Sequence, residues 1–164
     1  MMASEKEKLF TLVFVKNENG GNPQILLGLK KKGFDQGMWN GFGGKVEINE
    51  SILEGALREL REECGLTGEL KKLGVLHFHG REEETILVVH VLHTYSYNGA
   101  IIESEEMQPK WFGIKEIPFG EMKEDARFWF DHMLKGKFFK GYFRYENDRV
   151  IDHNIDELTK LEEN

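Results

Sequence analysis

The sequence predicts an α+β fold built on a mixed β-sheet. Strand-like and helical stretches follow one another without the strict alternation of a parallel β-α-β protein, which favours this class. The 164 residues are 40% hydrophobic and 31% charged, enough to form one well-packed core. The sequence contains no internal repeat and no linker, so we expect one domain over residues 1–164 with short charged tails. It also contains no run of 18 apolar residues, so we expect no membrane span.

Two apolar, β-branched stretches open the chain. Residues 9–15 and 24–29 predict a pair of strands, because the polar, Gly-rich segment 17–23 between them favours a turn. Residues 30–45 contain five glycines and predict a loop with short extended pieces.

Residues 51–64 change to a helical pattern, with apolar side chains at steps of three and four. Ser51 and Glu54 form the sequence of a capping box, and Gly65 predicts the helix end.

The second half of the chain is again rich in strands. The pattern predicts, in order, strands over 73–78 and 85–95 joined by the acidic turn 81–84, a short extended piece at 111–112, a helix over 121–134 and an aromatic strand over 138–145. We expect the charged end, 156–164, to fray.

The charge balance limits the partners. With 22 basic and 29 acidic residues the net charge is −7, which argues against nucleic acid or an anionic membrane as the main partner, since both require a dense cationic face. A small polyanion fits if a few cations gather in one cleft. The single cysteine, Cys64, excludes an internal disulfide framework, and the charged start, 1–8, lacks the apolar segment of a secretory signal. We therefore expect a cytoplasmic protein.

Three glutamates lie on one face of the first predicted helix. Glu59, Glu62 and Glu63 stand at i, i+3 and i+4, within about 6 Å of one another at Cβ. Like charges so placed repel, whereas a hard divalent cation such as Mg²⁺ or Mn²⁺ would reverse the sign of that energy. Arg58 flanks the group and Glu50 lies near the helix start. The alternative is a solvated acidic face.

A glycine loop, 39–45, directly precedes this helix, and glycines let a backbone approach a ligand closely. It is not a P-loop, because Trp39 occupies the first glycine position and no Ser or Thr follows Lys45. It is not a dinucleotide fingerprint either, because Val46 replaces the third glycine.

Gly44, five residues, Glu50, seven residues and then Arg58-Glu-Leu-Arg-Glu-Glu-Cys-Gly-Leu66 resemble a complete Nudix box over 44–66. The resemblance to Nudix hydrolases implies a mixed sheet sandwiched between α-helices and Mg²⁺-dependent hydrolysis of nucleoside diphosphate derivatives, with Mn²⁺ as a substitute. It also implies metal ligation by Glu59, Glu62 and Glu63, helped by the Gly43 carbonyl, with Arg58 and Glu50 supporting catalysis.

Motifs outside the box look like the animal oxidised-purine nucleoside triphosphatases, the 8-oxo-dGTPase or MutT-type group. They are Thr11, Lys30-Lys31, Gly33-Phe34, residues 39–45, Glu103-Ser104 with Glu106-Met107, Pro109 with Trp111-Phe112, residues 117–119 and residues 141–143. This resemblance implies a monomer that hydrolyses such triphosphates to monophosphate and pyrophosphate in nucleotide-pool sanitation, in the cytoplasm or in nuclear or mitochondrial pools. It makes Glu106 a further metal ligand. The substrate contacts it implies are Thr11, Lys30, Phe34, Asn40, Phe42, Gly43, Gly44, Lys45, Lys123, Asp125 and Trp129.

One segment departs from that group, which has a base-stacking tryptophan, a proline and two aspartates before an aromatic-Trp-Phe run. Here Lys123-Glu-Asp125-Ala126 precedes residues 128–130, so a lysine replaces the tryptophan and Ala126 replaces the second aspartate. A lysine offers no flat stacking face and an alanine no hydrogen bond. The preferred base is therefore left open, with oxidised dGTP as first choice.

Two alternatives to this function remain at this point. One is a Nudix hydrolase of another substrate, such as a dinucleoside polyphosphate or a nucleotide sugar; the other is a non-catalytic nucleotide-binding module. The complete glutamate set favours an enzyme, in which either Glu63 or Glu59 is the general base.

Overall fold

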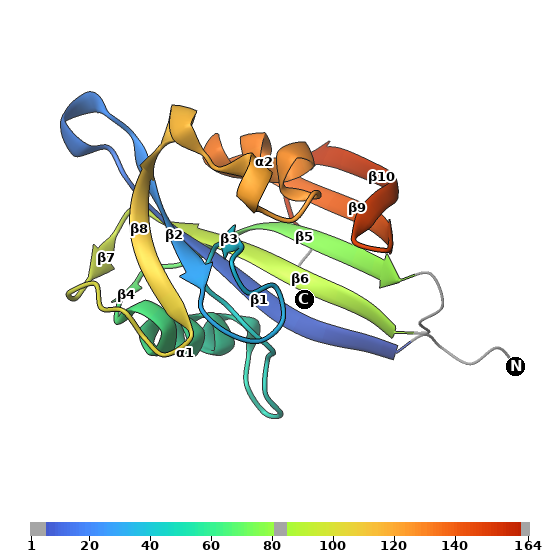
Figure 1. Cartoon of the computed structure of the whole chain (residues 1–164), viewed down its shortest axis with the longest axis horizontal. Helices are drawn as coiled ribbons and strands as arrows, with labels where there is room; N and C mark the ends of the chain where they lie inside the picture. The colour runs from blue at the N-terminus through green and yellow to red at the C-terminus, as the bar shows by residue number, and fades with distance from the viewer. Residues whose placement is uncertain (1–5, 81–84, 162–164) are drawn as a thin grey trace, which may run out of the picture.

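The computed structural model describes residues 6–80 and 85–161, and their main element is a curved mixed sheet (Figure 1). Its strand order is β10-β9-β5-β6-β1-β2-β3, with β8 also paired to β2. The strands are β1 (Lys6–Asn17), β2 (Gln24–Lys30), β3 (Trp39–Asn40), β5 (Lys71–Gly80), β6 (Thr85–Thr94), β8 (Met107–Gly113), β9 (Phe138–Glu146) and β10 (Arg149–Leu158). A separate two-stranded sheet pairs β4 (Thr67–Gly68) with β7 (Tyr97–Asn98).

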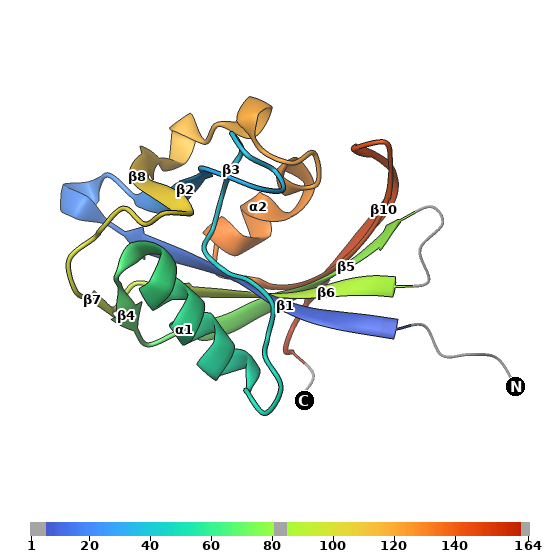
Figure 2. The same cartoon turned by 60° about the horizontal axis from the view of Figure 1, so that its bottom comes forward.

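Two helices cover opposite faces of this sheet, α1 (Ile52–Cys64) and α2 (Ala126–Leu134) (Figure 2). The predicted capping box is present in α1, because Ser51 Oγ accepts from the Glu54 amide and the Glu54 carboxylate accepts from the Ser51 amide, both at 3.0 Å. Gly65 ends α1 in the left-handed conformation, with φ 81°. The α+β class and this helix are therefore confirmed.

The pairing of β1 creates the space for a site. β1 pairs in parallel with β6 along ten residues but with β2 only over Val15–Asn17. Beyond that point the glycine segment 42–46 takes the place of β2: the amides of Thr11 and Val13 donate to the carbonyls of Gly44 (2.9 Å) and Phe42 (2.7 Å). The glycine loop is thus held against the middle of β1.

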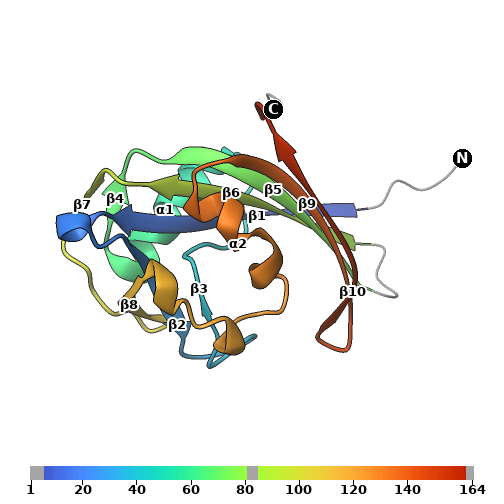
Figure 3. The ribbon, with the colours of Figure 1, turned by 90° about the horizontal axis from the view of Figure 1, so that it is seen from above.

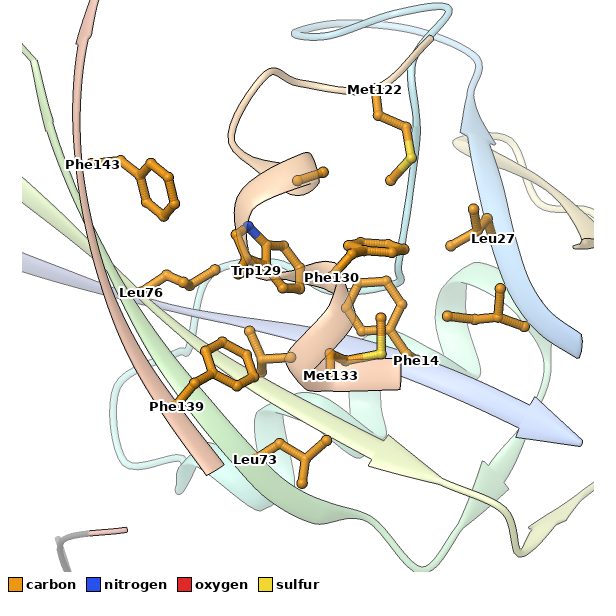
Figure 4. Close-up of a cluster of buried hydrophobic side chains, with 13 residues drawn as sticks. Phe14, Leu27, Leu73, Leu76, Met122, Trp129, Phe130, Met133, Phe139 and Phe143 are labelled. Carbon is orange, nitrogen blue, oxygen red and sulfur yellow. The ribbon is translucent and has the colours of Figure 1, made fainter. Parts of the chain in front are cut away.

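Alternating side chains of β1 feed two cores. Phe14 packs on the α2 side, whereas Val13 and Val15 pack on the α1 side. In the α2-side core Trp129 lies beside Phe139, with ring centroids 5.9 Å apart and nearly parallel planes (Figure 4). Figure 3 shows α2 between β9–β10 and the β2–β3–β8 part of the sheet.

Two expectations about the chain's second half are wrong in part. The helix predicted over 121–134 begins only at Ala126, because residues 119–121 form a 3-10 turn and Met122 is extended and buried. Residues 156–158, predicted to fray, belong to β10, because the backbone of β9 offers them a pairing edge.

The acidic turn 81–84 lies outside the described residues, although the strands on either side of it pair antiparallel as expected. Within the described ranges no helix has the length and apolar character needed to cross a membrane.

Candidate active site

At Gly43 and Gly44 the glycine loop passes between β1 and α1 with no room for a side chain. A Cβ atom on Gly43 would lie 1.8 Å from the carbonyl oxygen of Thr11, and one on Gly44 would lie 2.5 Å from Glu59 Oε1. Glycine at both positions therefore brings the loop backbone against the glutamate face of α1.

Arg58 organises the acidic residues around it. Its guanidinium binds both carboxylate oxygens of Glu50, at 2.7 and 2.9 Å, and donates to Glu59 Oε1 at 2.9 Å and to the Lys45 carbonyl at 3.1 Å. A longer contact of 3.4 Å reaches Glu62. The hydrogen bonds from Arg58 lower the pKa of Glu50 to about 2, so Glu50 is a permanent anion that fixes the arginine.

Glu63 has a different environment. Its side chain is 7% exposed, and Oε1 accepts from the Gly43 amide at 2.7 Å. Burial raises the pKa of Glu63 to about 8 and also raises the pKa of Glu59; the negative charge of Glu106 adds to both shifts. Two carboxylates whose ionised forms are costly thus stand next to each other.

A pocket of about 580 Å³ extends from this acidic group to the start of α2. Gly43, Gly44 and Glu63 line it beside α1; Asp125 and Trp129 line it at α2. Its size and its largely apolar lining with a few polar groups suit a small organic ligand.

One polar atom on the pocket wall lacks a partner among the described residues. Thr11 Oγ1 is buried, on a residue that is 2% exposed, and it makes no hydrogen bond. Burying a hydroxyl without a hydrogen-bond partner is costly in free energy. Because this hydroxyl lines the pocket, a ligand bound there could supply the missing hydrogen bond.

The sequence model of the NUDIX domain matches residues 8–134. The chain belongs to the Nudix family. The mixed sheet between helices is the Nudix fold.

Two curated relatives span almost the whole chain. The zebrafish protein named oxidized purine nucleoside triphosphate hydrolase is 44% identical over 94% of this chain and 97% of its own length. The mouse protein of the same name is 39% identical, over 92% of this chain and 96% of its own. The crystal structure of the mutator MutT protein from Bacillus halodurans superposes with a TM-score of 0.80 at 25% identity, covering 91% of this chain and 97% of that one.

Nudix hydrolases generally need a divalent metal such as Mg²⁺. The donor set fits one, because carboxylates and backbone carbonyls are hard oxygen ligands, and because a buried anion such as Glu63 gains from a nearby cation. Within the described ranges no group of three acidic, His or Cys side chains is arranged to hold a metal ion. Glu59 and Glu62 instead form ion pairs with Arg58. Metal loading would therefore require those carboxylates to turn.

The structure brings most of the residues expected to bind substrate into one pocket. Those that line it are Thr11, Lys30, Phe34, Asn40, Gly43, Gly44, Lys123, Asp125 and Trp129. Two expected residues do not line it: Phe42 is fully buried in the α1-side core, and Lys45 is exposed, with its carbonyl bound to Arg58. Glu106 is exposed on the turn before β8, near enough for its charge to act on Glu59 and Glu63.

Asp125 is held by two aromatic residues. Trp129 Nε1 donates to Oδ2 at 2.7 Å and the Tyr145 hydroxyl donates to Oδ1 at 2.5 Å. Burial raises the pKa of Asp125 against these hydrogen bonds. Asp125 thus ties α2 to β9 at the end of the pocket.

Several pocket residues escaped the sequence analysis, and Asp35 and Tyr145 are the two among them that contact Lys123. Tyr145 was grouped with the core-forming aromatic strand, and nothing local marks it, because its partner Asp125 lies 20 residues away. The signal for Asp35 was weak: two glycines, Gly33 and Gly37, bracket it and let the loop turn tightly.

Proposed function

We propose that this Nudix hydrolase converts oxidised purine nucleoside triphosphates, such as 8-oxo-dGTP, to the monophosphate and pyrophosphate and so clears damaged nucleotides from the pool. The observation that carries the proposal is the junction of the glutamate face of α1 with a nucleotide-sized pocket of about 580 Å³. The near full-length similarity to two proteins named oxidized purine nucleoside triphosphate hydrolase supports it. We further expect a cytoplasmic monomer that acts on small nucleotides.

The phosphates would bind at the α1 end. Glu59, Glu62, Glu63 and the Gly43 carbonyl would hold Mg²⁺, or Mn²⁺ in its place. Such an ion would neutralise negative charge on the phosphate oxygens and would lower the pKa of a water molecule bound to it. Lys30, which lines the same pocket, would add a positive charge for the phosphates.

The protein's own groups would handle the proton of the attacking water. Burial raises the pKa of both Glu59 and Glu63, so a carboxylate at either position is a stronger base than an exposed one. Glu63 Oε1 is already engaged by the Gly43 amide, which leaves Oε2 for the proton. Arg58, itself fixed by Glu50, holds Glu59 in position by donating to its carboxylate. The water oxygen would bond to one phosphorus of the α–β anhydride as its P–O bond breaks, which would release the monophosphate and pyrophosphate.

The nucleoside would extend along the pocket toward α2. Asn40 Oδ1 accepts from the neighbouring Gly41 amide at 2.8 Å, which directs the side-chain NH₂ of Asn40 to other acceptors. The unpaired Thr11 hydroxyl would gain its partner from the bound nucleotide.

A substrate panel with Mg²⁺ tests the proposal. We expect pyrophosphate and 8-oxo-dGMP from 8-oxo-dGTP, with kcat about 10²-fold lower or more in Glu63→Gln, since the variant loses a ligand charge and keeps the shape. Glu116→Gln, an exposed glutamate away from the pocket, is the matched control.

Other results would favour the alternatives. Turnover of only dinucleoside polyphosphates or nucleotide sugars would make this a Nudix hydrolase of another substrate. Nucleotide binding without turnover of any compound would make it a binding module.

A further inference from the structure

The α2 end of the pocket carries a cation in an unusual setting. Lys123 Nζ lies 3.7 Å from Asp35 Oδ2, and both side chains line the pocket with 36% of their surface exposed. The same ammonium lies 5.1 Å from the centre of the Tyr145 ring. An acid from the β2–β3 loop and an aromatic ring from β9 therefore fix one lysine at the pocket's end.

The supports of this lysine are themselves fixed. The Tyr145 hydroxyl is bound to buried Asp125, and the Asp125 amide lies 2.9 Å from the same hydroxyl. Asp35 sits at φ 63° between two glycines of positive φ, a conformation that Asp tolerates better than most residues. The neighbouring Phe34 is 82% exposed, so this loop stands at the pocket rim with little packing of its own.

The lysine keeps its hydrogen-bonding capacity for a ligand. A separation of 3.7 Å from Asp35 is an ion pair longer than a hydrogen bond. An ammonium has three donors and no acceptor, so it pairs with carbonyl oxygens and opposes amino groups. By contrast, both carboxylate oxygens of Asp125 already accept hydrogen bonds, from Trp129 and Tyr145. At this end of the pocket Lys123 therefore has more capacity than Asp125 to hydrogen-bond a ligand.

We propose that Lys123 is a specificity-determining residue that donates to an exocyclic carbonyl oxygen of the bound purine, and that Asp35 is its positioning residue. The inference rests on the proposed function, which places the triphosphate at the glutamates and hence the base toward α2. The enzyme then favours purines that present an oxo group to Lys123 over purines that present an amino group.

The pair dITP and dATP tests this preference, because the two nucleotides differ at position 6 by an oxygen against an amino group. The wild-type ratio of kcat/KM for dITP to that for dATP should exceed unity by about tenfold or more, the range of a hydrogen bond to a charged group. Lys123→Met keeps the length of the side chain and should reduce that ratio about tenfold, because dITP loses a hydrogen bond and dATP no longer faces an ammonium. Lys115→Met, at an exposed lysine that does not line the pocket, is the matched control.

Asp35→Asn tests the positioning role. Asn also tolerates positive φ, so the loop should keep its shape while the ion pair is lost. We expect a fall of about threefold in the same ratio, whereas a merely loosened loop would weaken both nucleotides equally. Asp35→Glu, which retains the charge, should recover part of the ratio.

Binding of dIMP and dAMP without metal, measured by calorimetry, separates this inference from the proposed hydrolysis. Selective binding of dIMP that Lys123→Met abolishes supports the inference even if no triphosphate is cleaved. Turnover of 8-oxo-dGTP with a dITP/dATP ratio unchanged in Lys123→Met overturns the inference and leaves the hydrolase intact. Absence of both binding and turnover overturns both.

Discussion

Replacing Gly43 or Gly44 of the glycine loop with alanine should separate catalysis from folding. In Gly44→Ala the new methyl group would lie 2.5 Å from Glu59 Oε1, whereas ordinary contacts begin at 3.4 Å. The carboxylate must therefore move by about 1 Å, and a misplacement of about 1 Å in a catalytic group can cost roughly 10²-fold in rate. The backbone of Gly44 has no positive φ, so the free energy of unfolding should stay within about 1 kcal/mol of wild type.

Gly43→Ala should behave in the opposite way. Its methyl group would meet the Thr11 carbonyl oxygen at 1.8 Å, and that oxygen belongs to paired backbone that cannot rotate away. Parting the loop from β1 weakens the hydrogen bonds that the Thr11 and Val13 amides donate, at about 0.5–1.5 kcal/mol each, and adds overpacking of about 1–3 kcal/mol. A loss of about 2–6 kcal/mol corresponds to a fall in Tm of roughly 4–24 °C for a chain of this size.

The assay is pyrophosphate release from 8-oxo-dGTP at saturating Mg²⁺, with thermal unfolding of both variants measured in parallel. We expect Gly44→Ala to fold and to lose turnover, and Gly43→Ala to lose stability. If Gly44→Ala retains kcat within about threefold of wild type, the position of the Glu59 carboxylate does not matter for catalysis and the reasoning fails.

Three further predictions follow from other parts of the chain. Lys16 is 2% exposed beside His93 and the Met133 carbonyl, and burial lowers the pKa of Lys16 to about 8 from 10.5. Below pH 8 the fold therefore bears the cost of a buried charge, so Lys16→Met should raise the free energy of unfolding by up to about 3 kcal/mol at pH 7. That gain should shrink as the pH rises through 8 toward 10.5; a constant gain in denaturation measured from pH 7 to 10 would contradict the burial argument. Asn40→Ala should lower kcat/KM for the preferred purine far more than for a pyrimidine nucleotide, by the equivalent of about 1–3 kcal/mol; an equal loss on all bases would place Asn40 outside the base pocket. Ser51→Ala should cost about 1 kcal/mol in chemical denaturation, because it removes the cap of α1, and should leave the KM unchanged.

The sequence carried much of the chemistry because that chemistry is local. Sequence spacing alone places Glu59, Glu62 and Glu63 on one face of a helix. Ser51 and Glu54 mark the start of that helix, and Gly65 marks its end. The strands that begin the chain followed from their alternating or continuous apolar runs. Such features depend on neighbours within a few residues and need no tertiary contact.

Other features were decided only when distant segments met. Phe42 belongs to the glycine loop by sequence, yet pairing of that loop with β1 turns its side chain into the α1-side core. Residues 156–158 form a strand because β9 provides a pairing edge, despite their charge.

The same holds for the α2 end of the pocket. Sequence singled out Lys123 by its departure from a familiar pattern, but its partner Asp35 lies on a loop between two other strands. The environments of Glu63 and Lys16 also come from packing, since the burial that shifts their pKa values is supplied by segments far away along the chain. The sequence by itself determined the glutamate helix and the class of fold; tertiary structure decided which side chains share the pocket and which charges are desolvated, because burial and ion pairing depend on distances that only the folded chain sets.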